Sequence, residues 1–118
     1  MTKIEALSAV TLHVADMAKS FAFYAALGFD VHYGDAAAVF SSFRLGPGSF
    51  LNLQAIKGSP GTGWGRVILH VDDVDAVHAR ALGAGLRPEK EPEDAPWGER
   101  YFHIRDPDGH ELSFARYL

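Results

Sequence analysis

Alternating apolar residues mark two short segments that are near copies of each other. Residues 10–16 read VTLHVAD, and residues 67–73 read VILHVDD. Each segment is rich in β-branched residues and ends on an aspartate that can cap a following helix, which predicts a strand that leads into a helix. Because strand side chains alternate between faces, the valines and leucines of each copy should pack under its helix, while His13 and His70 point the other way.

The residues after each copy predict the same succession of elements. In the first half, helical spacing from Asp16 to Leu27 ends at Gly28, a residue typical of helix C-caps, and strands are expected over residues 29–33, 37–45 and 50–56. In the second half we expect a helix from residue 74 to about 83–85 and a short strand over 86–90. Residues 91–98 should form a surface loop, because their two prolines keep them out of a sheet. Strands are expected over 100–105 and 111–116, joined by a turn at 106–109. The sequence therefore predicts two units of strand, helix and three strands.

The chain should fold as a single α+β domain over residues 1–118, with module one at about 7–56, a linker at 57–64 and module two at about 65–118. The linker prediction rests on the glycines and the proline concentrated in residues 58–65. The periodicity assigns a set of apolar residues to the core: Val10, Leu12, Phe23, Leu27, Leu53, Leu69, Val71, Val77 and Phe102.

Composition narrows the classes of function. A net charge of −4 provides no basic surface for nucleic acid or for an anionic membrane, so neither partner is expected. The chain has no cysteine, which excludes disulfides, thiolate metal sites and thiol catalysis. The first residues open no long apolar segment, and we therefore expect a cytoplasmic protein without a membrane span.

Several of these motifs together resemble a known superfamily. Residues 14–17 (VADM) lead to Phe23-Tyr24 and to residues 27–29 (LGF), HVD recurs at 70–72, and RDPDG closes the set at 105–109. This combination is similar to the vicinal-oxygen-chelate superfamily, which includes glyoxalase I, extradiol dioxygenases, fosfomycin-resistance transferases and bleomycin-resistance proteins. The resemblance implies two βαβββ modules that form curved mixed sheets around a cleft, commonly within a homodimer.

The metal-dependent members of the superfamily share a set of ligand positions, which can be located on this chain. The position at the start of the first strand holds Ala9, and its counterpart in the second module holds Arg66. The position after the closing turn holds Ser113, and the one in the fourth strand holds Asn52. Alanine cannot bind a metal, and a permanently charged arginine repels one, so no metal and no cofactor are expected.

A shifted metal site is the alternative, because His13, His70 and Glu111 are ligand types that zinc or iron accepts. Each histidine lies four residues past its family position, or roughly 13 Å further along its strand. Glu111 is displaced in the opposite sense, so the three side chains should not converge.

Without a metal, the face that looks away from the helices should bind a ligand. The candidate ligand-binding residues are Thr11, His13, Asn52, Gln54, Arg66, His70, Trp97, His103 and Ser113. Arg66 needs either an anionic ligand group or a salt bridge with Glu99 or Glu111. Trp97 either stacks on a planar ligand or covers the cleft or a dimer seam. Along the strand after Trp97, Phe102 and Ile104 should pack, while Tyr101, His103 and Arg105 should line the polar face.

The closest resemblance is to the metal-independent bleomycin-resistance proteins, which implies capture of a small planar or cationic molecule in a metal-free cleft, as in antibiotic sequestration. No residue is assigned a catalytic role. An alternative is a metal-dependent lyase, isomerase or dioxygenase of the glyoxalase type with an atypical ligand set. A third alternative is a regulatory or scaffold subunit with a vestigial cleft.

Overall fold

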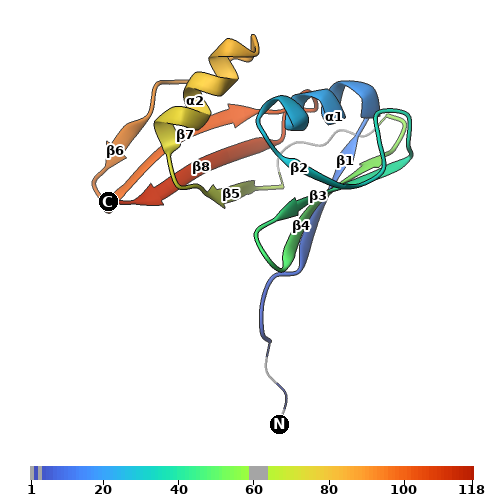
Figure 1. Cartoon of the computed structure of the whole chain (residues 1–118), viewed down its shortest axis with the longest axis horizontal. Helices are drawn as coiled ribbons and strands as arrows, with labels where there is room; N and C mark the ends of the chain where they lie inside the picture. Colours follow the sequence, from blue (N-terminus) through green and yellow to red (C-terminus); the bar gives the residue numbers. More distant parts are fainter. Residues whose placement is uncertain (1, 3, 59–63) are drawn as a thin grey trace. The chain divides into compact units, whose positions relative to one another are not determined.

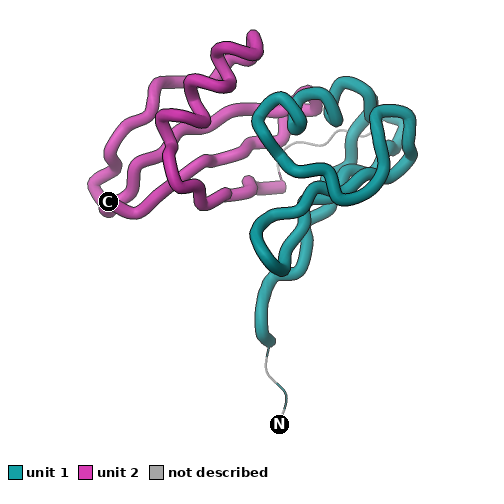
Figure 2. The backbone as a smooth tube through the Cα atoms, in the orientation of Figure 1, with its two compact units in different colours: residues 1–59 teal, residues 60–118 magenta. Residues whose placement is uncertain are grey.

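The structure is a computed structural model that describes residues 2, 4–58 and 64–118. The chain divides into two compact units, residues 1–59 and 60–118 (Figure 2). The first unit contains β1 (Ala9–Val14), α1 (Met17–Ala26), β2 (Asp30–Tyr33), β3 (Phe40–Leu45) and β4 (Ser49–Ala55), and the second contains β5 (Arg66–His70), α2 (Val74–Gly83), β6 (Glu93–Ala95), β7 (Glu99–Arg105) and β8 (Glu111–Tyr117) (Figure 1). The predicted order of strand, helix and three strands is confirmed in both units.

Each unit is one mixed sheet of four strands with one helix. The strand order is β1-β4-β3-β2 in the first sheet and β5-β8-β7-β6 in the second. β1 runs parallel to β4 and β5 runs parallel to β8, whereas the remaining pairs are antiparallel. This arrangement confirms the predicted α+β class with two βαβββ modules.

The core of the first unit lies between α1 and one face of its sheet. An aromatic cluster forms its centre, because the ring of Phe43 lies 5.3 Å from Phe21, 5.8 Å from Tyr24 and 5.9 Å from Phe29. The buried apolar residues of this unit are Leu12, Val14, Met17, Phe23, Tyr24, Leu27, Phe43, Leu51 and Leu53. Thr11 and His13 are exposed, so β1 alternates as predicted.

The second core repeats this plan, with the rings of Phe102 and Phe114 stacked 5.3 Å apart. The apolar residues buried between α2 and the sheet are Val67, Leu69, Val74, Ala81, Phe102, Ile104, Leu112 and Phe114. Ala95 and Ala115 are also buried, but strand register places them on the opposite face of the sheet. Three residues predicted for the two cores, Val10, Val71 and Val77, are only partly buried. Val10 and Val71 lie near the ends of their strands, and Val77 lies on the flank of α2. At these positions the packing between helix and sheet covers only part of each side chain.

The predicted helix caps are present in both copies. Asp16 accepts a hydrogen bond from the backbone N–H of Lys19 at 3.2 Å, and Asp73 accepts one from Ala76 at 3.0 Å. Gly28, just after α1, has a φ of +92°, which residues with a Cβ rarely adopt. Capping chemistry thus sets both ends of α1 at the residues that the sequence predicts.

One strand is placed differently from the prediction. No strand forms over residues 86–90, and β6 lies instead within residues 91–98, which were predicted to form a loop. Pro92 and Pro96 flank β6 without belonging to it, and β6 is an edge strand that pairs only with β7. An edge strand needs few N–H donors, so three residues between two prolines suffice. Of the predicted linker, residues 59–63 lie outside the described residues.

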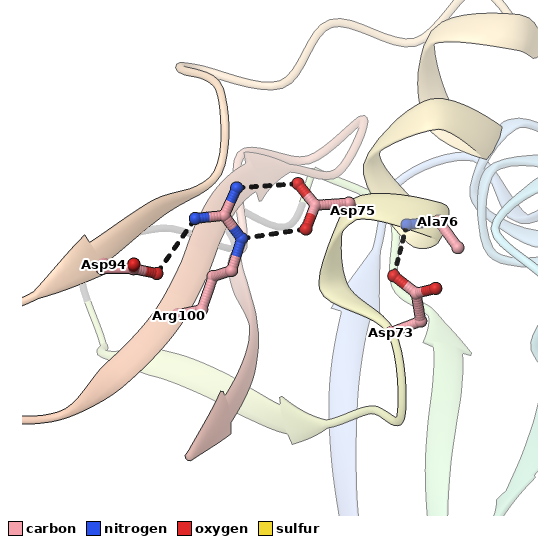
Figure 3. Close-up of polar contacts among 5 residues, drawn as sticks. All are labelled: Asp73, Asp75, Ala76, Asp94 and Arg100. Atoms are coloured by element: carbon pink, nitrogen blue, oxygen red, sulfur yellow. Dashed lines mark hydrogen bonds and ion pairs between the residues drawn. The ribbon is translucent and has the colours of Figure 1, made fainter. Parts of the chain in front are cut away.

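Arg100 joins α2 to the edge of the second sheet (Figure 3). Its Nε and Nη2 donate to the two carboxylate oxygens of Asp75, at 2.9 and 2.8 Å, and its Nη1 donates to Asp94 in β6 at 2.9 Å. The hydrogen bonds from Arg100 lower the pKa of Asp75, and those to Asp75 and Asp94 raise the pKa of Arg100. The first turn of α2 is thereby tied to one face of the sheet, and the other face carries the candidate site.

Candidate functional site

The face of the second sheet that points away from α2 carries most of the polar and aromatic chemistry of this unit. Strand register places the side chains of this face in rows: Arg66, Glu111 and Arg105; Ile68, Ser113 and His103; His70, Ala115 and Tyr101; and Tyr117 beside Glu99. The predicted alternation of β7 is confirmed, because Phe102 and Ile104 are buried while Tyr101, His103 and Arg105 lie on the opposite face.

Three rings form a ladder along β7 on this face. The indole of Trp97, in the turn between β6 and β7, stacks on Tyr101 with a centroid distance of 5.8 Å and an interplanar angle of 27°. Tyr101 in turn lies 5.0 Å from the ring of His103. Trp97 is 68% exposed, and its Nε1 donates to Glu99 Oε1 at 2.9 Å. A flat and largely exposed indole is thus held in a defined orientation.

Arg66 is paired with a carboxylate of its own sheet. Its Nη2 lies 2.8 Å from Glu111 Oε2, and the two side chains are 48% and 16% exposed. Of the two predicted acidic partners, Glu111 therefore binds Arg66, while Glu99 accepts the hydrogen bond from Trp97. The charge of Arg66 has a partner within the sheet and does not require an anionic ligand.

The other candidate residues of the second sheet differ in accessibility. His70 is exposed, and its ring lies 4.8 Å from that of Tyr117. Ser113 is only 5% exposed, since it lies between Ile68 and His103 on neighbouring strands. Nδ1 of His103 is buried and makes no hydrogen bond among the described residues. His103 is therefore the one candidate here with an unused buried polar atom in the described part of the chain.

The first sheet carries the remaining four candidates on the face that points away from α1. Thr11 lies opposite Asn52, whose Nδ2 donates to Thr11 Oγ1 at 3.2 Å. His13 lies opposite Gln54 in the next row. The structure thus brings Thr11, His13, Asn52 and Gln54 together as a patch of neutral hydrogen-bonding groups and one imidazole.

Sequence reasoning missed a second cluster on this face. Arg44 Nη2 donates to His32 Nδ1 at 3.0 Å, and the Arg44 guanidinium lies 5.1 Å from the ring centroid of Phe50. His32 also lies 4.7 Å from Phe50. The three residues come from three strands, so only the strand pairing, and no local motif, could have identified them.

The residues that the structure describes do not fit a divalent metal. Among the described residues, no group of three or more His, Asp or Glu side chains is arranged to hold one. Within the second unit, Glu111 lies opposite Arg66, and His70 lies four residues further along β5, or roughly 13 Å away. Glu111 is also occupied by Arg66. We therefore derive no chemistry that requires a metal ion.

Nor do the helices suggest a membrane segment, since within the described ranges none is long and apolar enough to cross a bilayer.

The fold and the open sheet faces agree with a match to a family model. The model for the Glyoxalase/Bleomycin resistance protein/Dioxygenase superfamily matches residues 6–114, and the chain belongs to this family. This result confirms the resemblance that the HVD and RDPDG motifs suggested.

Individual proteins that resemble this chain share only a limited part of its sequence. An uncharacterised protein of Mycobacterium tuberculosis is 38% identical over 69 residues, a match that covers 58% of this chain and 38% of that protein. The match thus spans well under half of that relative. The crystal structure of TioX from a Micromonospora species has a TM-score of 0.77 at 26% identity and covers 97% of this chain and 100% of TioX. The bleomycin resistance determinant encoded on transposon Tn5 also has a TM-score of 0.77, at 24% identity with 98% of both chains covered, and shows the shared fold.

Proposed function

We propose that the protein binds a small planar or cationic molecule on the open sheet faces, without a metal, and that capture of this molecule is its function. The observation that carries the proposal is the ladder of Trp97, Tyr101 and His103. An exposed indole held by Glu99 offers a flat apolar surface in a fixed orientation, so little entropy is lost when a planar ligand stacks on it.

Charge on the same face favours a cation. Glu93, Glu99 and Glu111 lie on the ladder face or at its edge. Of the two arginines on this face, Arg66 pairs with Glu111 and Arg105 pairs with Glu89, so neither arginine neutralises Glu93 or Glu99. Carboxylates beside aromatic rings attract a positively charged ring system through both charge and the negative face of the π system. The bleomycin resistance determinant of Tn5 has the same fold, which makes antibiotic sequestration the first form of capture to test.

The proposal includes the remaining predictions from the sequence. The ligand-binding residues would be Thr11, His13, Asn52 and Gln54 on the first sheet and Arg66, His70, Trp97, His103 and Ser113 on the second. We further propose that the protein acts as a homodimer in the cytoplasm.

The experiment is a titration with metal-free bleomycin followed by heteronuclear NMR of the tryptophan indoles. The chain has two tryptophans, and Trp97→Phe assigns their indole resonances. We expect bleomycin to shift the Trp97 indole resonance and to leave that of Trp64 unchanged, because Trp64 donates to His110 away from the ladder. Calorimetry should show stoichiometric binding that Trp97→Ala abolishes. An unchanged Trp97 resonance at saturating bleomycin would contradict sequestration of this antibiotic class.

A second titration addresses the metal. Adding zinc, manganese or iron(II) should leave the thermal unfolding midpoint unchanged, because Ala9, Asn52 and Arg66 cannot form a ligand set. Tight binding of one equivalent of zinc would refute the metal-free proposal.

A further inference from the structure

The edge of the second sheet contains a gap between β6 and β7. Glu93 pairs with Tyr101, and the next backbone contact along the edge is a hydrogen bond of 3.1 Å from the N–H of Glu89 to the carbonyl of His103. Four residue steps on the edge segment, from 93 back to 89, therefore span two steps on β7. Pro92 has no N–H and cannot donate to β7, so residues 90–92 bulge away from the ladder.

The bulge encloses a pocket of about 130 Å³, lined by Glu89, Lys90, Glu91, Glu93, Tyr101, Phe102 and His103. A pocket for a complete drug-sized ligand usually measures about 300–1,000 Å³. This pocket is therefore suited to one end group of a ligand. Tyr101 belongs both to the pocket lining and to the ring ladder, so the pocket adjoins the surface on which a planar group would stack.

The pocket is rich in hydrogen-bond acceptors. Tyr101 uses its only O–H donor on Glu93 Oε1 at 2.7 Å, and this hydrogen bond, followed by burial, raises the pKa of Tyr101 so that the phenol stays protonated. The phenol oxygen keeps its lone pairs for another donor. Nδ1 of His103 is buried without a partner among the described residues, and it is an acceptor in the tautomer that carries the proton on Nε2.

The charge of the lining is negative. Three carboxylates face one lining cation, Lys90, and Arg105 binds one of them, Glu89, at 3.1 Å. Glu91 has no ion-pair or hydrogen-bond partner in the part of the chain that the structure describes. A group that carries both positive charge and N–H donors would satisfy the carboxylates and the acceptor atoms at once.

We propose that this pocket is a subsite for a cationic end group that carries N–H donors, such as a primary ammonium or a guanidinium, on a ligand whose planar part stacks on the ladder of Trp97 and Tyr101. The proposal rests on the proposed function and deepens it, because it states which cations the protein accepts. A quaternary ammonium has the same charge but no N–H, and it leaves the acceptors of Tyr101 and His103 unsatisfied. The subsite therefore selects against quaternary cations.

Three benzyl compounds that share one ring test the selection. Benzylammonium has charge and N–H donors, benzyltrimethylammonium has charge alone, and benzyl alcohol has neither charge nor N–H. Their dissociation constants are measured by heteronuclear NMR, with the Trp97 indole and the His103 ring as reporters. We expect benzylammonium to bind about tenfold more tightly than either of the others, which is the size of effect that a charge-assisted hydrogen bond provides.

Variants locate the selection in the pocket. Glu91→Gln should weaken benzylammonium binding severalfold and leave benzyl alcohol unaffected, while Glu5→Gln removes the same charge outside the pocket and should change neither. His103→Phe removes the acceptor Nδ1 and keeps a ring in the ladder, so it should reduce the preference for benzylammonium over benzyltrimethylammonium.

Each other outcome is decisive. Equal affinities for the three compounds, with shifts at Trp97, would overturn the subsite and leave the stacking surface of the proposed function intact. Tighter binding of benzyltrimethylammonium than of benzylammonium would overturn selection through N–H donors. No shift at Trp97 with any compound at millimolar concentration would overturn both proposals.

Discussion

Two phenylalanines of β3 provide a direct test of which sheet face is covered and which is open. Phe43 is fully buried under α1, at 0% exposure, and its ring contacts three other aromatic rings. Phe40 lies on the opposite face, 37% exposed, in the same row as the candidate ligand-binding residue Gln54. Replacing each with alanine makes the same chemical change on the two faces of one strand.

The two substitutions should differ clearly in cost. Phe43→Ala removes a ring from a closed aromatic cluster and leaves a cavity, which typically costs about 3–5 kcal/mol. Phe40→Ala opens no closed cavity, and the partial burial that it loses corresponds to about 1–2 kcal/mol. Urea unfolding followed by circular dichroism measures both, and with a slope of about 2 kcal/mol per molar the two midpoints should lie about 1 M apart.

Equal midpoints would refute the reasoning. They would mean that the face with Gln54 is covered as closely as the core, so that a ligand could not reach it. An unchanged slope of the unfolding transition for both variants is the control that the denatured state has not changed.

Further predictions concern a cap, an ion pair and a turn. Asp73→Ala should lower the free energy of unfolding by about 1 kcal/mol, measured in urea, because it removes the N-cap of α2. Arg100→Gln should destabilise the protein at pH 7. Arg100 lowers the pKa of Asp75 below its usual 3.8, so the stability difference from the wild type should persist above pH 3.8 and disappear as the pH falls through the lowered pKa. Thermal unfolding from pH 7 to 2.5 can follow this difference. Gly34→Ala should lower the melting temperature, because a Cβ at a φ of +82° would lie 2.6 Å from a backbone oxygen, whereas Gly48→Ala, with nothing within 4 Å, should have little effect; equal melting temperatures would contradict this.

Part of the candidate site follows from the sequence because strand parity is local. The alternation of β7 predicts that Tyr101, His103 and Arg105 share a face, and the backbone keeps them there. The choice between Glu99 and Glu111 as the partner of Arg66 is not local. It depends on β8 lying between β5 and β7, which places Glu111 directly opposite Arg66.

The pocket beside β6 was beyond sequence reasoning for the same reason. Pro92 and Pro96 predict that residues 91–98 form a loop. This prediction is wrong for residues 93–95, which form β6, because an edge strand needs few backbone N–H donors. The mismatch that opens the pocket appears only when the edge segment is counted against β7.

The sequence alone determines the order of strand, helix and three strands, both helix caps and the alternation of faces along β1 and β7, because periodicity and capping act over a few residues. Tertiary structure decides which carboxylate pairs with Arg66, how Arg100 ties α2 to the sheet edge, and where β6 leaves a gap. These features depend on register between strands that are distant in the chain, and no local pattern encodes that register.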